Sequence, residues 1–190
     1  MASVVGICNR ALQKLGAQGI TSLSENSRNS RSLNKAYDLV RQAELEAHPW
    51  NFSIKRASLA ADTPTPDWGR ANSFQLPSDY LRLLNDYPER LFGDEDYQIE
   101  GRKIITNFGA PLEIRYIYNV TDPNEMSALF REVLACKLAF ELCEEITGSN
   151  SKLANVQTEY ENEIRKARRT NAIQNRPALA PDDTFISCRR

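Results

Sequence analysis

The stretch DPNEMSALFREVLACKLAFELCEEITG, residues 122–148, decides the fold class of this chain. Its apolar side chains recur at helical spacing and cover much of the helix circumference, so we expect this helix to be buried against more than one neighbour. The pattern predicts Asp122 as the N-cap, Pro123 in the first turn and Gly148 as the stop. The apolar positions are Met126, Leu129, Phe130, Val133, Leu134, Leu138, Leu142 and Ile146.

Three further segments have helical periodicity. Residues 2–15 and 28–47 each carry one broad apolar face, and they are followed by the natural stops Gly16 and Pro49. We expect these two helices to pair through their apolar stripes. Residues 149–173 predict a longer and far more polar helix, which packs on the domain along one narrow stripe and exposes the rest. The stripe is formed by Leu153, Val156, Tyr160, Ile164 and Ala167.

The segment between the second and third helices has the pattern of strands. NFSIKRASL (51–59) and LEIRYIYNV (112–120) alternate apolar and polar residues, and YQIEGRKIITN (97–107) is typical of a hairpin with a Glu-Gly turn. TPTPDWGR (63–70) contains two prolines and breaks regular structure. We therefore expect one small antiparallel sheet of about four or five strands.

The fold class that follows is α+β. We expect a four-helix bundle-like domain built from residues 1–50 and 122–175, with an antiparallel β sub-domain, residues 51–121, inserted between helices 2 and 3. The last segment, 176–190, contains Pro177 and Pro181, so a helix cannot run through it. It is predicted to be an extended docking arm, because an apolar pair and two arginines stand near its end.

Composition excludes several classes of protein. Apolar residues make up 41% of the chain and charged residues 26%, with a formal net charge of −1, which is typical of a soluble globular protein. A net charge this close to zero provides no overall positive charge that would attract nucleic acid or an anionic membrane. Neither a membrane-spanning apolar run nor a signal peptide is recognisable, so we expect synthesis in the cytoplasm and no membrane partner.

Catalytic and metal-binding patterns are weak. The four cysteines, Cys8, Cys136, Cys143 and Cys188, are interpreted as buried, inert thiols, and we predict no metal and no cofactor. The single histidine, His48, is interpreted as the cap of a helix end, where the dipole favours a cation.

A basic cluster at the end of the fourth predicted helix admits three interpretations. Complementing the helix dipole is the favoured interpretation; a contact with acidic side chains of a partner comes second, and a contact with DNA phosphates third. No interleaved aromatic residues accompany it, which weakens the nucleic-acid interpretation. The cluster consists of Arg165, Lys166, Arg168 and Arg169, with Arg176 beyond it.

Several quoted segments, in order, resemble the tail tubular protein A family, the head-to-tail adaptors of short-tailed bacteriophages and related prophages. The resemblance covers nearly the whole chain and rests on the order and spacing of the segments rather than on one strong motif. The segments are ICNRALQKLGAQGITSL, AHPWNFSIKRASLA, FQLPSDYLRLL, IEGRKIIT, LEIRYIYNVTDPNEMSALFREVLACKLAFELCEEITGS and ARRTNAIQN.

The resemblance implies a structural virion protein without enzymatic activity. Family members form a ring, usually of about twelve copies. The ring lies between the portal protein and the tail nozzle (tail tubular protein B) and leaves a channel for DNA ejection without specific DNA binding. It implies localisation to the virion tail, and portal binding through the C-terminal arm. The arm residues implied are Pro181, Asp182, Asp183, Phe185, Ile186, Arg189 and Arg190.

Three alternatives stay open. A cell-wall or polysaccharide hydrolase would need two carboxylates about 5 to 10 Å apart, and Asp94, Glu95 and Asp96 are the local candidates. A DNA-binding module would use the basic cluster. A head-completion factor or chaperone would leave before the particle matures.

Overall fold

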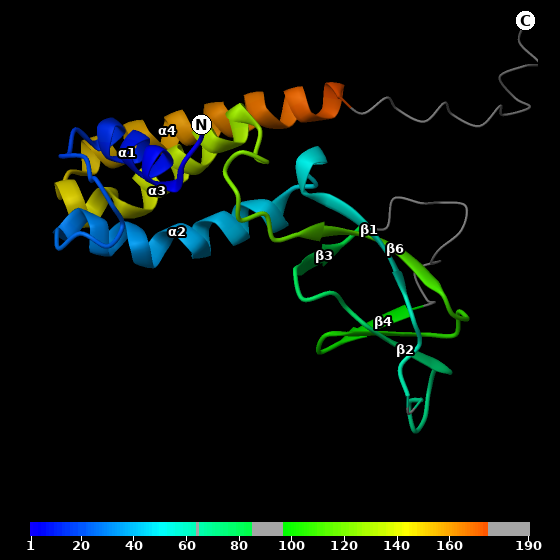
Figure 1. Cartoon of the computed structure of the whole chain (residues 1–190). Helices are drawn as coiled ribbons and strands as arrows, with labels where there is room; N and C mark the ends of the chain where they lie inside the picture. Colours follow the sequence, from blue (N-terminus) through cyan, green and yellow to red (C-terminus); the bar gives the residue numbers. More distant parts are fainter. Residues whose placement is uncertain (64, 85–96, 175–190) are drawn as a thin grey trace, which may run out of the picture.

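The computed structural model describes residues 1–63, 65–84 and 97–174, and it confirms the α+β class. Figure 1 shows the helices gathered on one side of the molecule and the strands on the other, with the end of α2 and the start of β1 between them. The elements are α1 (Val4–Leu15), α2 (Arg28–Ala47), a short 3-10 turn (Asn51–Ser53), β1 (Ile54–Leu59), β2 (Asn72–Gln75), β3 (Tyr80–Leu83), β4 (Tyr97–Glu100), β5 (Lys103–Thr106), β6 (Leu112–Tyr118), α3 (Ala128–Thr147) and α4 (Asn150–Ile173).

The helix α3 is the centre of the helical domain, as its apolar circumference predicts. The helix α3 packs against all three other helices, α1, α2 and α4, and nine of its residues are buried. The predicted start of α3 is wrong: Ser127 is the N-cap, with its hydroxyl accepting a hydrogen bond from the Phe130 N–H at 3.2 Å. Asp122 instead accepts from the Asn124 N–H at 2.8 Å in a preceding turn, because its carboxylate satisfies the backbone two residues on. Gly148 ends the helix in the left-handed conformation, at φ 59°.

The predicted pairing of the first two helices is also wrong. Within the described residues, α1 and α2 each pack mainly on α3 and have few contacts with each other. The physical reason is that α3 is apolar on several sides and can accept both stripes. The helix α4 packs on α3 through buried Val156, Ile164 and Ala167, which confirms its narrow stripe.

The strands form two sheets, not one. β1, β6 and β3 make an antiparallel sheet in the order β1-β6-β3, and β2, β5 and β4 make a second in the order β2-β5-β4. The predicted hairpin is confirmed as β4 and β5, joined at Gly101, whose φ of 59° suits glycine. The strand prediction over 51–59 begins three residues early, since Asn51–Ser53 is a 3-10 turn.

Two hydrophobic cores correspond to the two parts of the chain. One lies among the four helices and the other between the sheets, where Phe74, Ile104 and Leu112 are almost fully buried. Aromatic rings bind the helical core to the connector that leads into β1: Trp50 and Phe52 each lie 5.1 Å from the Phe130 ring, centroid to centroid. None of the described helices is long and apolar enough to cross a membrane.

Candidate functional site

The C-terminal part of α4 is the most distinctive exposed surface that the sequence singled out. All four members of the basic cluster that lie in the described chain, Arg165, Lys166, Arg168 and Arg169, are exposed. Two of them have partners within the helix: Arg165 Nε donates to the Glu161 carbonyl at 2.9 Å, and Lys166 pairs with Glu163 at 2.6 Å.

The other two arginines of the cluster have no partner in the part of the chain that the structure describes. Among the described residues, neither Arg168 nor Arg169 forms a side-chain hydrogen bond or ion pair, and both residues are exposed. One turn further along the helix, Ile173 is 75% exposed. The exposed end of α4 therefore combines two guanidinium groups that have no ion-pair partner in the described chain with an apolar side chain, which is a surface chemistry suited to binding an acidic macromolecule.

This end of α4 is held to the α2–β1 connector by Asn171. The Asn171 amide accepts a hydrogen bond from the Asn51 N–H at 2.9 Å, donates to the Pro49 carbonyl at 3.1 Å, and lies 3.2 Å from His48 Nε2. The Asn51 side chain in turn donates to the Asn171 carbonyl at 2.9 Å and to Gln174 at 3.2 Å. We call these contacts the Asn171 clamp. Sequence reasoning missed it, because its partners are about 120 residues apart.

His48 is the C-cap residue of α2, as predicted, but the expected cation is not favoured there. Burial, reinforced by the positive charges of Arg168 and Arg82, lowers the pKa of the imidazole below its usual value. The neutral imidazole therefore dominates at neutral pH. The ring packs edge-on against Trp50, with centroids 4.6 Å apart.

The three described cysteines, Cys8, Cys136 and Cys143, are unpaired and buried, which confirms their predicted burial. Burial raises the pKa of Cys8 to about 12 and that of Cys136 to about 11, so both stay protonated and unreactive at neutral pH. Cys188 lies outside the described residues.

Cys136 borders a charged network that joins three helices. Glu132, Cys136 and Glu159 bring ligand atoms within 4.8 Å of one another, the kind of donor set that can bind a metal ion. The Lys14 ammonium contacts the same carboxylates, lying 2.8 Å from Glu132 and also pairing with Glu159. Because the chain supplies its own cation to these two carboxylates, we interpret the network as a tie between α1, α3 and α4.

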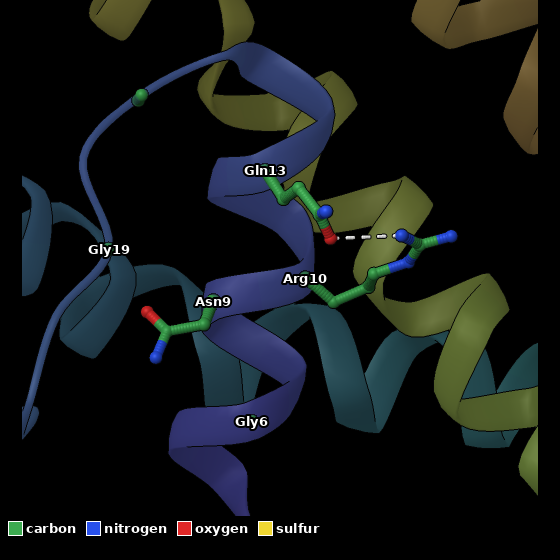
Figure 2. Close-up of a pocket in the computed structure, with 6 residues that line it drawn as sticks. Gly6, Asn9, Arg10, Gln13 and Gly19 are labelled. Atoms are coloured by element: carbon green, nitrogen blue, oxygen red, sulfur yellow. Dashed lines mark hydrogen bonds between the residues drawn. The ribbon is translucent and has the colours of Figure 1, made fainter.

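A shallow hollow lies beside α1, lined by Gly6, Asn9, Arg10, Gln13, Ala17 and Gly19 (Figure 2). Its polar groups are used within the chain. Arg10 donates to Gln13 at 2.9 Å and pairs with Glu132 at 3.0 Å, while the Asn9 amide bonds both backbone groups of Ile20. The hollow thus offers few unsatisfied groups to a ligand.

The remaining predicted residues lie outside the described chain. They comprise Asp94, Glu95, Asp96, Arg176, Pro181, Asp182, Asp183, Phe185, Ile186, Arg189 and Arg190. No protein-family model matches this chain, and a search of curated proteins returns no significant match.

Proposed function

We propose that this protein is a structural adaptor of a phage particle, which assembles as a ring between the portal protein and the tail nozzle and leaves a channel for DNA. The order of sequence segments that resembles the tail tubular protein A family supports this function. The observation that carries it on the molecule is the exposed end of α4, where Arg168 and Arg169 have no ion-pair partner among the described residues.

The architecture is suited to joining two different partners. The helical core and the β core are separate clusters, so each part can present a surface of its own to a different partner. The contact between neighbouring copies would be heterologous, with two different patches of each subunit meeting head to tail around the ring. We place the portal contact at the end of α4 and along the arm, residues 176–190.

The test is to mix the protein with its cognate portal and to measure the mass of the complex. The full chain should bind with about one copy per portal subunit, and a chain that ends at Arg176 should bind much more weakly, because multivalent arm contacts are lost. If the truncated chain assembled on the portal as well as the full chain, the proposed role of the arm in portal binding would be refuted. No complex with either chain would refute the portal as partner.

A second experiment separates the basic end of α4 from the arm. The pair Arg168→Glu and Arg169→Glu in the full chain should weaken portal binding at least tenfold, since like charges would face the acidic partner. The pair Arg31→Glu and Lys35→Glu is the matched control, because both residues are exposed cations on α2 and the pair changes the net charge by the same amount. Equal losses in both variants would point to net charge rather than to a specific contact.

DNA binding by the same arginines is the second candidate function, favoured by their exposure. It predicts that the protein binds duplex DNA with a steep salt dependence and that the double Glu variant loses this binding. Failure to bind at low salt would exclude it. The hydrolase alternative stays an untested prediction, because its carboxylates, Asp94, Glu95 and Asp96, lie outside the described residues.

A further inference from the structure

The last turns of α4 are held differently from the rest of the helix. Ala167 is its last buried residue, and from Arg168 to Gln174 every residue is exposed except the half-buried Asn171. Hydrophobic burial therefore holds the helix as far as Ala167. Beyond that point, the hydrogen bonds of the Asn171 clamp join the end of α4 to the connector between α2 and β1.

Two backbone groups determine how the Asn171 amide is oriented. The Asn51 N–H can only donate a hydrogen bond, so the Asn171 side-chain oxygen must face the Asn51 N–H. The Pro49 carbonyl can only accept one, so the Asn171 side-chain nitrogen must face the Pro49 carbonyl. The nitrogen is also the atom that lies 3.2 Å from His48 Nε2. Because this nitrogen is a donor, His48 Nε2 must accept, which requires a neutral imidazole that carries its proton on Nδ1.

We propose that the Asn171 clamp is a pH-sensitive joint, in which protonation of His48 releases the end of α4 from the connector. A proton on Nε2 would place an N–H against the Asn171 NH₂ group, and the hydrogen bond would become a repulsion between two donors. The inference does not depend on what the protein binds, since it rests on the clamp alone.

The charges around His48 act in the same direction. Arg168 from α4 and Arg82 from β3 are the charged groups of the described chain that influence the imidazole, and both disfavour a second positive charge. Together with burial they lower the pKa of His48. We call the joint closed when the Asn171 clamp is formed and open when it is broken. Because the pKa of His48 is lower in the closed joint, the closed joint is fully favoured above the ordinary histidine pKa of about 6.5. This preference is lost as the pH falls through the lower pKa that His48 has in the closed joint.

The size of the effect follows from linkage. Between the histidine pKa of the open joint and that of the closed joint, the opening equilibrium should rise about tenfold for each pH unit of acidification, and then level off. The Asn51 N–H reports opening directly, because its acceptor is the Asn171 side chain. His48 is the only histidine in the chain, so its imidazole resonances need no further assignment.

The experiment uses the full chain, labelled with nitrogen-15. At pH 7.5 the imidazole should carry its proton on Nδ1 and none on Nε2. The hydrogen-exchange protection factor of the Asn51 amide should fall from pH 7.5 to pH 5, while the protection factors of amides in α3 stay constant. Protonation on Nε2 at pH 7.5 would overturn the proposal. Constant Asn51 protection while His48 titrates would overturn it as well.

Two variants test the mechanism independently of overall stability. His48→Gln supplies an uncharged acceptor close to the position of Nε2, so the Asn51 protection factor should no longer depend on pH. Asn171→Asp keeps an acceptor for the Asn51 N–H but removes the donor to the Pro49 carbonyl, so the joint should be weaker at pH 7.5. Protonation of His48 would now supply a donor to the carboxylate, so protection of the Asn51 amide should rise on acidification. An unchanged acid loss of protection in either variant would refute the role of His48.

Discussion

Replacing Lys14 with methionine should cost about 2 kcal/mol of the free energy of unfolding, because Lys14 is the hub of the network that joins α1, α3 and α4. Its side chain is only 5% exposed and pairs with both Glu132 and Glu159. Burial by itself would lower the pKa of Lys14, but the hydrogen bonds to these carboxylates outweigh it, so the pKa is raised above its usual value. Methionine retains the aliphatic length of the side chain and removes the charge.

The magnitude follows from the exposure of the three partners. Removing one member of a fully buried ion pair costs about 3–5 kcal/mol, because the other charge is left without compensation. Here Glu132 and Glu159 are 28% and 45% exposed, and Arg10 still pairs with Glu132. Water and Arg10 therefore offset part of the loss, which lowers the expected cost to about 2 kcal/mol.

Urea denaturation followed by circular dichroism measures this cost. The midpoint should shift without a change in the slope with denaturant, and the melting temperature should fall by about 5 °C. Lys166→Met is the matched control, since Lys166 is 65% exposed and pairs with one carboxylate on its own helix; its cost in unfolding free energy should be far smaller than that of Lys14→Met. Equal costs for Lys14→Met and Lys166→Met would refute the idea that burial makes this network stabilising.

Three further substitutions test the fold. Phe130→Ala should cost about 3–5 kcal/mol, measured by chemical denaturation, because the ring is fully buried and packs against two other rings of the connector. Ser127→Ala should lower the free energy of unfolding by about 1 kcal/mol, and Asp122→Ala should lower it clearly less, since Ser127 is the observed cap. A larger loss for Asp122→Ala than for Ser127→Ala would instead support Asp122 as the cap, as the sequence predicted. Gly148→Ala should cost about 1 kcal/mol for its positive φ, whereas Gly109→Ala, without a positive φ, should be neutral in the same assay.

The helices could be predicted because their evidence is local. An apolar stripe with a period near 3.6 and a cap at each end lies within one stretch of sequence, and it placed all four helices to within a few residues except the start of α3. That start was misplaced because Asp122 with Pro123 and Ser127 both resemble a helix beginning. The structure uses Ser127 as the cap and leaves Asp122 in the preceding turn, with Met126 between them buried in the core.

The sheet arrangement could not be predicted in the same way. β6 pairs with β1 and with β3, and β5 pairs with β2 and with β4, so each sheet combines strands that are distant in the sequence. Alternation shows that a segment is a strand, but it does not show which strand lies beside it. One expected sheet therefore became two, with the second hydrophobic core between them.

The same distinction applies to the candidate site. The sequence by itself determined the α+β class, the central position of α3, and the basic cluster at the end of α4, because composition and periodicity are properties of contiguous residues. Only the tertiary structure decided which arginines lack a partner in the described chain, how Lys14 reaches two carboxylates, and that Asn171 meets His48, Pro49 and Asn51. The Lys14 and Asn171 contacts join residues more than 100 positions apart: the first form where α1 meets α3 and α4, and the second where the end of α4 meets the connector after α2.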